Sequence, residues 1–247
     1  DEERRAREAL EPLSQELAAS TYPRLEKKQR AAVRAALVAL RARFAARRAA
    51  WSAHTSAGEW ADAEHHARIA EQAEALYSAP GDYFVRDAAM AENVRWLLER
   101  EGKGTRMMLW AHNGHVSMTD RFMGRALRRA LGRDYAAIGF LFDRGSFQAF
   151  DGSPAKAGLK EFTLGPAPAA TLEAAFARAG APLLYVDLRA ARGQVKAWLD
   201  QAQPSRQAGA VFSTEQAMTA PHEVGKEFDA VIFVDRTTRA RPIGRAP

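Results

Sequence analysis

The sequence predicts an α/β fold: a mostly parallel sheet with helices on both of its faces, together with a helical subdomain. Two observations lead to this prediction. Apolar residues recur at the spacing of amphipathic helices throughout residues 1–78. From Pro80 onward, short apolar runs alternate with helical patterns, as strands and helices do in α/β proteins. We therefore expect a helical subdomain at 1–78 and an α/β core at 79–247.

Three helices are expected in the first of these parts. The first helix contains Leu10, Leu13 and Leu17 and ends before Pro23. A long apolar stripe follows, made of Val33, Leu37, Leu40, Phe44 and Trp51. After the polar interruption SAHTSAG, a third helix carries Trp60, Ile69, Ala73 and Leu76. Stripes of this kind usually pack into a core, so we expect the three helices to pack together.

The predicted core alternates helices and strands. Helices are expected over about fifteen residues ending at Gly102, and then at 121–132, 171–180 and 193–202; strands are expected at 105–111, 135–142, 182–189 and 228–237, with a loop at 143–158. The strands are almost continuously apolar, which is typical of a parallel sheet buried on both faces. Ligands of such sheets bind beyond the carboxyl ends of the strands.

Composition limits the classes of function. The net charge is +6, but the basic residues are interleaved with acidic ones, which argues against a nucleic-acid partner. The chain has no cysteine, which excludes disulfides, thiolate catalysis and cysteine zinc sites. No run of 18 apolar residues is present, so no membrane partner is expected. The arginine- and alanine-rich composition suggests a bacterial source; the compartment is left open, with the cytoplasm as the default and export as the alternative.

Two histidines, His112 and His115, stand where the first predicted strand ends. Their H-x-x-H spacing holds zinc when further ligands are near, but Asn113 and Gly114 between them favour a turn, and spacing nominates no third ligand. Imidazoles also transfer protons near neutral pH, and a loop at a strand end aims them into a cleft. A structural role, such as capping the next helix, is the remaining interpretation.

A second polar stretch is VRDAAMAENVRW, at 85–96. On a helix, Arg86 and Asn93 share one face with apolar neighbours, which indicates a partly buried polar patch. Arg86 could hold a carboxylate or a developing oxyanion, or form a structural salt bridge. No G-x-S-x-G sequence occurs, which argues against a serine hydrolase. Neither a Walker A nor a G-x-G-x-x-G sequence is present, and no cofactor is expected.

Four motifs in order carry a resemblance to a known family. RDAAMAENVRWLL, MMLWAHNGHVSM, MGRALRRALGRDYAAIGFLFDRGSFQA and FDAVIFVDRTTRARP resemble the erythromycin esterase family across about 160 residues. The resemblance implies an esterase/haem-scavenging-like core and hydrolysis of a cyclic ester by histidine-assisted water attack. Macrolide inactivation, and with it antibiotic resistance, belongs to only some members of the family.

The same resemblance assigns site residues. His115, His112 and Arg86 are the expected catalytic residues, and Asn113, Glu92 and Asn93 the expected substrate-binding residues; no metal is expected. His115 would transfer a proton or hold the attacking water, His112 would orient the loop, and Arg86 would stabilise charge on the ester oxygen. The expected partner is a small-molecule ester.

One feature of the family is missing. Nothing in residues 1–85 matches its G-E-x-x-H-G-like motif. We therefore expect this chain to be the later portion of a larger domain, with an upstream segment as a further partner. A ligand- or haem-binding module without turnover, and a basic helical interaction protein, are the alternative functions.

Overall fold

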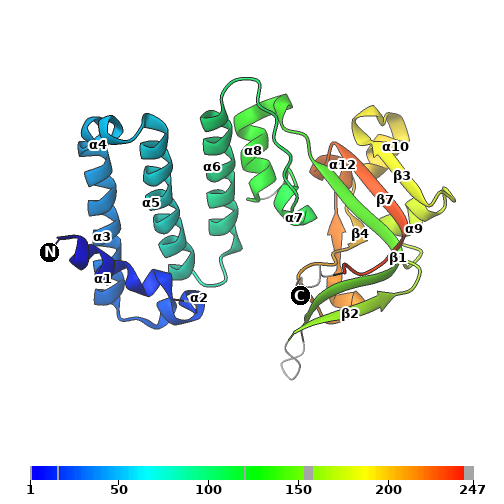
Figure 1. Cartoon of the computed structure of the whole chain (residues 1–247). Coiled ribbons are helices and arrows are strands. Elements are labelled where there is room, and N and C mark those ends of the chain that lie inside the picture. Colours follow the sequence, from blue (N-terminus) through cyan, green and yellow to red (C-terminus); the bar gives the residue numbers. More distant parts are fainter. Residues whose placement is uncertain (1, 16, 120, 153–157, 242–247) are drawn as a thin grey trace. The chain divides into compact units, whose positions relative to one another are not determined.

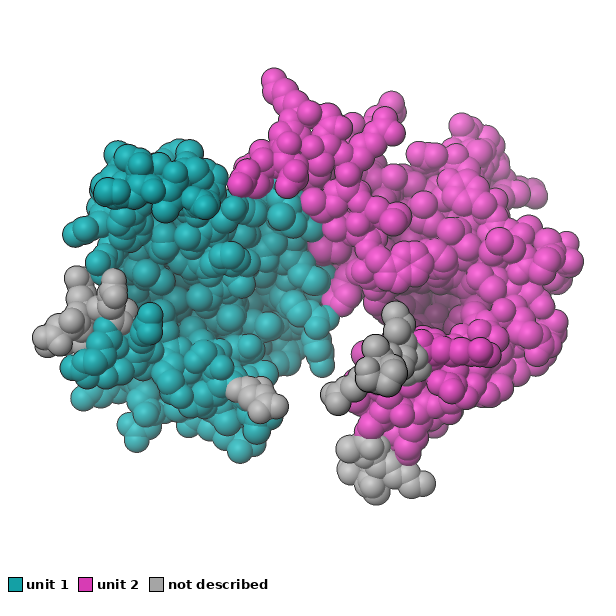
Figure 2. Space-filling model, in the orientation of Figure 1, with its two compact units in different colours: residues 1–97 teal, residues 98–247 magenta. Residues whose placement is uncertain are grey.

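The computed structural model describes residues 2–15, 17–119, 121–152 and 158–241. The chain divides into two compact units, residues 1–97 and 98–247 (Figure 2). Among the described residues, no helix combines the length and the apolar character that crossing a membrane requires. The predicted domain boundary between residues 78 and 79 stays a prediction.

The first unit is built of helices, as expected from its apolar spacing (Figure 1). They are α1 (Glu2–Ser14), α2 (Ala18–Thr21), the 3-10 turn Tyr22–Arg24, α3 (Lys27–Ala46), α4 (Arg48–His54), α5 (Ala57–Ser78) and α6 (Tyr83–Glu101), the last of which runs on into the second unit. The long predicted stripe is split at Arg47 into α3 and α4. Its members Val33 and Leu37 are buried together with Tyr22, whereas Leu17 is exposed.

A buried hydrogen bond between Tyr22 and Glu74 stabilises the packing of these helices. The Tyr22 hydroxyl donates to Oε1 of Glu74 at 2.9 Å, and Arg34 and Ser78 donate to the same oxygen at 2.8 and 2.7 Å. Tyr22 is fully buried, and this burial, together with the Glu74 carboxylate, raises its pKa to about 12. The phenol therefore stays a neutral donor at physiological pH, which satisfies a carboxylate that is itself buried.

The second unit is built around a sheet with the strand order β2-β1-β7-β3 (Figure 1). Its strands are β1 (Ile138–Asp151), β2 (Leu159–Leu164), β3 (Leu183–Asp187), the short β5 (Val211–Phe212) and β7 (Ala230–Thr237). A separate two-stranded sheet contains β4 (Gln203–Arg206) and β6 (Thr219–His222). The helices are α7 (Asn113–Val116), α8 (Met123–Leu131), α9 (Leu172–Ala177), α10 (Gly193–Leu199), α11 (Glu215–Met218) and α12 (Val224–Glu227), and 3-10 turns occupy Gly132–Asp134 and Leu188–Ala190.

The α/β class is confirmed, but the sheet is mixed instead of mostly parallel. β1 pairs in parallel with β7 and with β5, whereas β1–β2 and β3–β7 are antiparallel. The segment that joins β1 to β2 is too short for the crossover that parallel neighbours need, so the two strands run in opposite directions. An antiparallel strand at the edge, as β3 is here, is common in otherwise parallel sheets.

Two segment predictions are wrong. Residues 105–111 form no strand, and Met108 and Trp110 are 88% and 81% exposed. The predicted loop at 143–158 is instead β1 as far as Asp151; its residues 153–157 lie outside the described part of the chain. β1 continues because Gly145, at φ 119°, brings its backbone against Thr237 where a side chain would clash.

The two faces of the sheet differ in how deeply their side chains are buried. On the buried face, Phe176 of α9 stacks on the fully buried Phe233 of β7, with ring centroids 6.0 Å apart. On the other face Phe140, Leu183 and Tyr185 remain exposed. Their apolar character therefore does not indicate burial within this chain.

Candidate functional site

The H-x-x-H motif forms a single helical turn, α7, fixed to the edge of β1. The Asn113 side chain donates to the Phe140 carbonyl at 2.7 Å and accepts from the Phe140 amide at 2.9 Å. Its carboxamide thus pairs with the strand as a neighbouring peptide group does. The Asn113–Gly114 turn expected from the sequence is therefore helical, and its first side chain sets the position of both histidines that flank it.

His112 caps this turn. Its Nδ1 accepts from the Gly114 amide at 3.2 Å, so this nitrogen carries no proton. The neutral ring then has its proton on Nε2, which donates to the carbonyl of Ala208. Desolvation by the surrounding atoms lowers the pKa of His112, and the charges of His115 and His222 lower it further. The hydrogen bond from Gly114 and the lowered pKa both favour the neutral form of His112, which suits a residue that orients the turn.

His115 lies in the last residues of α7 and is half-buried. Its backbone amide donates to the His112 carbonyl at 2.9 Å. Because the charge of His115 acts on the pKa of His112, the two imidazoles are near neighbours. The structure thus brings together the two histidines that the motif predicts.

A third histidine belongs to this cluster and was missed by the sequence analysis. His222, at the end of β6, lies with Nδ1 at 3.0 and 2.9 Å from the two carboxylate oxygens of Glu227. The charge of His222 acts on the pKa of His112 as well. No motif joins these residues. A usable signal was that His112, His115 and His222 are the only histidines in residues 98–247.

The turn is braced from several elements. The Tyr135 hydroxyl donates to the Val116 carbonyl at 2.7 Å, and the Met118 amide donates to the Glu227 carbonyl at 2.9 Å. Gly124 of α8 lies so close to the carbonyls of Val116 and Ser117 that a Cβ there would overlap them. These contacts connect α7 with α8 and α12, so the histidines stand on a supported turn and not on a free loop.

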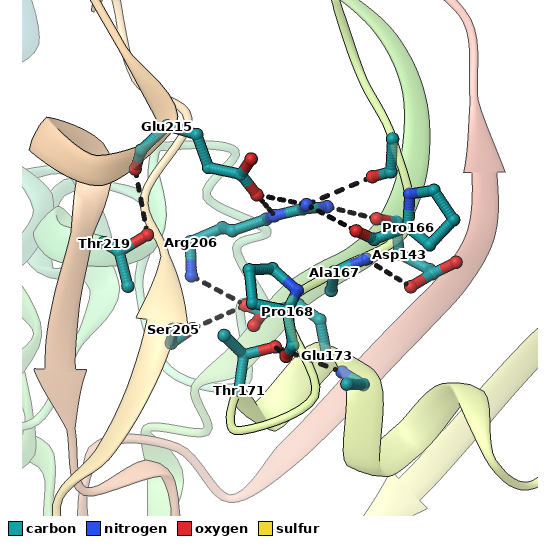
Figure 3. Close-up of polar contacts among 12 residues, drawn as sticks. Asp143, Pro166, Ala167, Pro168, Thr171, Glu173, Ser205, Arg206, Glu215 and Thr219 are labelled. Carbon is teal, nitrogen blue, oxygen red and sulfur yellow. Dashed lines mark hydrogen bonds and ion pairs between the residues drawn. The ribbon is translucent and has the colours of Figure 1, made fainter.

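A buried polar cluster lies around Arg206, at the end of β4 (Figure 3). The Arg206 guanidinium, with 2% of its side chain exposed, bonds to Glu215 and to the carbonyls of Asp143, Gly165 and Pro166. Glu173 is fully buried and accepts from the Ser205 hydroxyl at 2.6 Å and from the Arg206 amide at 2.9 Å. This cluster fixes the end of β4, and Ala208, which accepts from His112, follows two residues later.

Glu92 and Asn93 belong to the first unit, on α6. Arg68 of α5 donates to both oxygens of Glu92, at 2.6 and 2.8 Å, and this pairing lowers the pKa of Glu92. Asn93 donates to Gln72 of α5 at 3.0 Å. Both side chains therefore join helices α5 and α6, and their assignment to substrate binding stays a prediction.

Arg86, in the first turns of α6, is exposed, while the adjacent Asp87 is fully buried. Its role in stabilising an oxyanion also stays a prediction. Among the residues that the structure describes, no group of three or more histidine, aspartate and glutamate side chains is arranged to hold a metal ion.

Three solved structures share this fold. A protein from Bacillus cereus superposes with a TM-score of 0.79 at 24% identity over 89% of this chain. A succinoglycan biosynthesis protein gives 0.76 at 18% identity over 95%, and a variant of the erythromycin esterase EreC, in its open conformation, gives 0.68 at 17% identity over 94%. The chain spans 55%, 57% and 59% of their respective lengths.

A search of the curated proteins finds no match. The erythromycin esterase family, in contrast, matches residues 1–237, which is almost the whole chain and includes every residue of the histidine cluster. This confirms the resemblance drawn from the four sequence motifs. The chain belongs to the erythromycin esterase family.

Proposed function

We propose that this protein is a carboxylic ester hydrolase that cleaves a cyclic ester by histidine-assisted attack of water, without a serine nucleophile. Family membership over residues 1–237 supports the reaction class. The name of one structural neighbour, an erythromycin esterase, supports a lactone as the class of substrate. The observation that carries the proposal is the cluster of His112, His115 and His222, in which the Gly114 amide donates to Nδ1 of His112 and Nδ1 of His222 bonds to Glu227.

Each catalytic residue has a distinct proposed role. His115 holds the attacking water or takes part in its deprotonation, because an imidazole nitrogen can accept or donate a proton. His112 keeps the turn in place, since the Gly114 amide and the Ala208 carbonyl occupy its two nitrogens. Arg86 is proposed to stabilise negative charge on the ester oxygen, and loss of such a donor typically costs about 10²–10³-fold in rate.

The test is lactone hydrolysis by the complete protein and by its His115→Ala variant. Erythromycin is the first probe, and p-nitrophenyl acetate is a second, chromogenic ester; mass spectrometry detects a product heavier by one water. We expect the wild type to hydrolyse an ester and His115→Ala to lose this activity while its circular dichroism spectrum is unchanged. His54→Ala is the matched control, because His54 is an exposed histidine of the first unit.

Retained hydrolysis in folded His115→Ala contradicts the assignment of His115. A wild type that hydrolyses neither ester, and that instead gives a haem absorbance band on titration with haemin, contradicts the enzyme assignment. That second result favours the alternative of a ligand-binding module on the same fold.

A further inference from the structure

His222 and Glu227 form a histidine–carboxylate pair outside the H-x-x-H motif. Both carboxylate oxygens lie within 3.0 Å of Nδ1, and Oε1 also accepts the Glu223 amide at 3.0 Å. The Glu227 side chain is only 9% exposed. The carboxylate is therefore held by the backbone of its own turn, and it fixes the orientation of the imidazole.

This arrangement determines which nitrogen of the ring is available. An ionised carboxylate only accepts hydrogen bonds, so Nδ1 of His222 carries the proton. The neutral ring then presents a lone pair at Nε2. Within the described part of the chain, no hydrogen bond engages Nε2, and 23% of the side chain is exposed. A carboxylate on one nitrogen and an open lone pair on the other is the arrangement that activates a histidine as a base.

The pair is linked to the H-x-x-H motif already described. His222 ends β6, whose partner β4 leads into the segment that contacts His112 through Ala208. On the other side, the carbonyl of Glu227 accepts the amide of Met118, two residues after α7. Both members of the pair are thus connected by backbone to the elements that hold α7.

We propose that His222 is a further acid–base residue of this site, with Glu227 as the residue that positions it. The inference rests on the proposed ester hydrolysis and deepens it. As the oxygen of water bonds to the acyl carbon, Nε2 takes the proton that the water releases, and Glu227 stabilises the imidazolium. When the ester carbon–oxygen bond breaks, the imidazolium returns this proton to the leaving alkoxide, which gives one acid and one alcohol.

Titratable groups from more than one element lie near His222. Its titratable neighbours are Glu227, His112 and the ion pair between Glu223 and Lys226, in which Lys226 lies 2.7 Å from the carboxylate. β4 contributes Gln203 opposite His222 in the sheet, and this residue does not titrate. Among these groups, Glu227 contacts the imidazole directly.

The experiment compares His222→Gln and Glu227→Gln with wild type in the complete protein. Erythromycin and p-nitrophenyl acetate are the probes, and kcat and kcat/KM are measured across pH. We expect His222→Gln to lower kcat by about 10²–10⁴-fold, the usual contribution of a general acid–base group. The matched controls are His54→Gln and Glu223→Gln, the second of which removes a carboxylate from the same turn without touching the imidazole.

The Glu227→Gln variant tests whether Glu227 positions the His222 imidazole for proton transfer or only stabilises the fold. Without the carboxylate, the imidazolium loses the negative charge beside it, so the acidic limb of kcat/KM is expected to move to lower pH by about one pH unit. Glu227→Asp restores the charge and is expected to move the limb back toward wild type. If the pair only stabilised β6, Glu227→Gln would change folding but would leave the acidic limb of kcat/KM where it is. The pH profile of Glu227→Gln therefore tests the inference even where His222→Gln folds poorly.

The outcomes distinguish this inference from the proposed function. If the wild type hydrolyses ester and His115→Ala does not, but folded His222→Gln keeps kcat within about twofold, the inference about His222 is wrong and the esterase assignment stands. An unshifted acidic limb in Glu227→Gln also overturns it. If the wild type hydrolyses neither ester, both assignments fail together.

Discussion

Replacing Asn113 with alanine tests how α7 is held. The change removes two hydrogen bonds, of 2.7 and 2.9 Å, between the carboxamide and the backbone of Phe140. Each bond contributes about 0.5–1.5 kcal/mol, but Phe140 is 41% exposed, so water replaces part of what is lost. We expect Asn113→Ala to lower the free energy of unfolding of the second unit by about 1–2 kcal/mol.

The assay is urea unfolding followed by hydrogen exchange at the Phe140 amide. A loss of about 1 kcal/mol corresponds to roughly fivefold faster exchange, and the effect should be local to the edge of β1. Asn113→Asp is the matched control, because its carboxylate still accepts from the amide but cannot donate to the carbonyl. Equal stability and equal exchange in Asn113→Ala and wild type would refute the account of how α7 is positioned.

Three further predictions concern the support of the site and the response to pH. Gly124→Ala should destabilise the second unit by about 1–3 kcal/mol in urea unfolding, because its Cβ overlaps backbone carbonyls, whereas Gly165→Ala, where a Cβ meets nothing, should be neutral. Arg206→Met should cost about 3 kcal/mol, since it leaves buried carbonyls without a donor, and thermal melting measures this loss. Desolvation lowers the pKa of both His65 and His112, so the unfolded chain binds their protons more readily than the folded chain does. The contribution of the two neutral imidazoles to the free energy of unfolding should therefore be fully present above about pH 6.5 and should fall as the pH drops. His65→Phe should reduce the slope of the free energy of unfolding against pH.

Patterns that depend on local spacing predicted the fold well. The strand expected at 228–237 is β7, and the strand expected at 182–189 contains β3. The stripe around Val33 and Leu37 packs into the core of the first unit. Periodicity succeeds in these cases because burial of one face of an element is encoded within the element itself.

Pairing between distant segments was not predictable in the same way. The apolar run 105–111 looks like a buried strand, but strand formation needs a partner, and its side chains Met108 and Trp110 are exposed. Gly145 lies within the predicted loop at 143–158, although it is the residue that lets β1 pass close to Thr237. In both cases the missing information is tertiary and lies outside the local sequence.

The site was predicted in part for a related reason. His112 and His115 are linked by a motif, and the structure brings them together on α7. His222 and Glu227 have no recognisable spacing, because a strand end and a separate helical turn supply them. Asn113 was singled out correctly as part of the turn, but its bonds to Phe140 could not be read from sequence, since the edge of β1 becomes its neighbour only in the fold.

The most direct test of the central claim is incubation of the complete protein with erythromycin in water labelled with heavy oxygen. The account predicts a ring-opened product with one labelled oxygen in its new carboxyl group. It also predicts that His115→Ala, folded as wild type, yields none. Unchanged lactone with wild type, or equal labelling with both proteins, would contradict the claim that the histidines around α7 direct water to an ester.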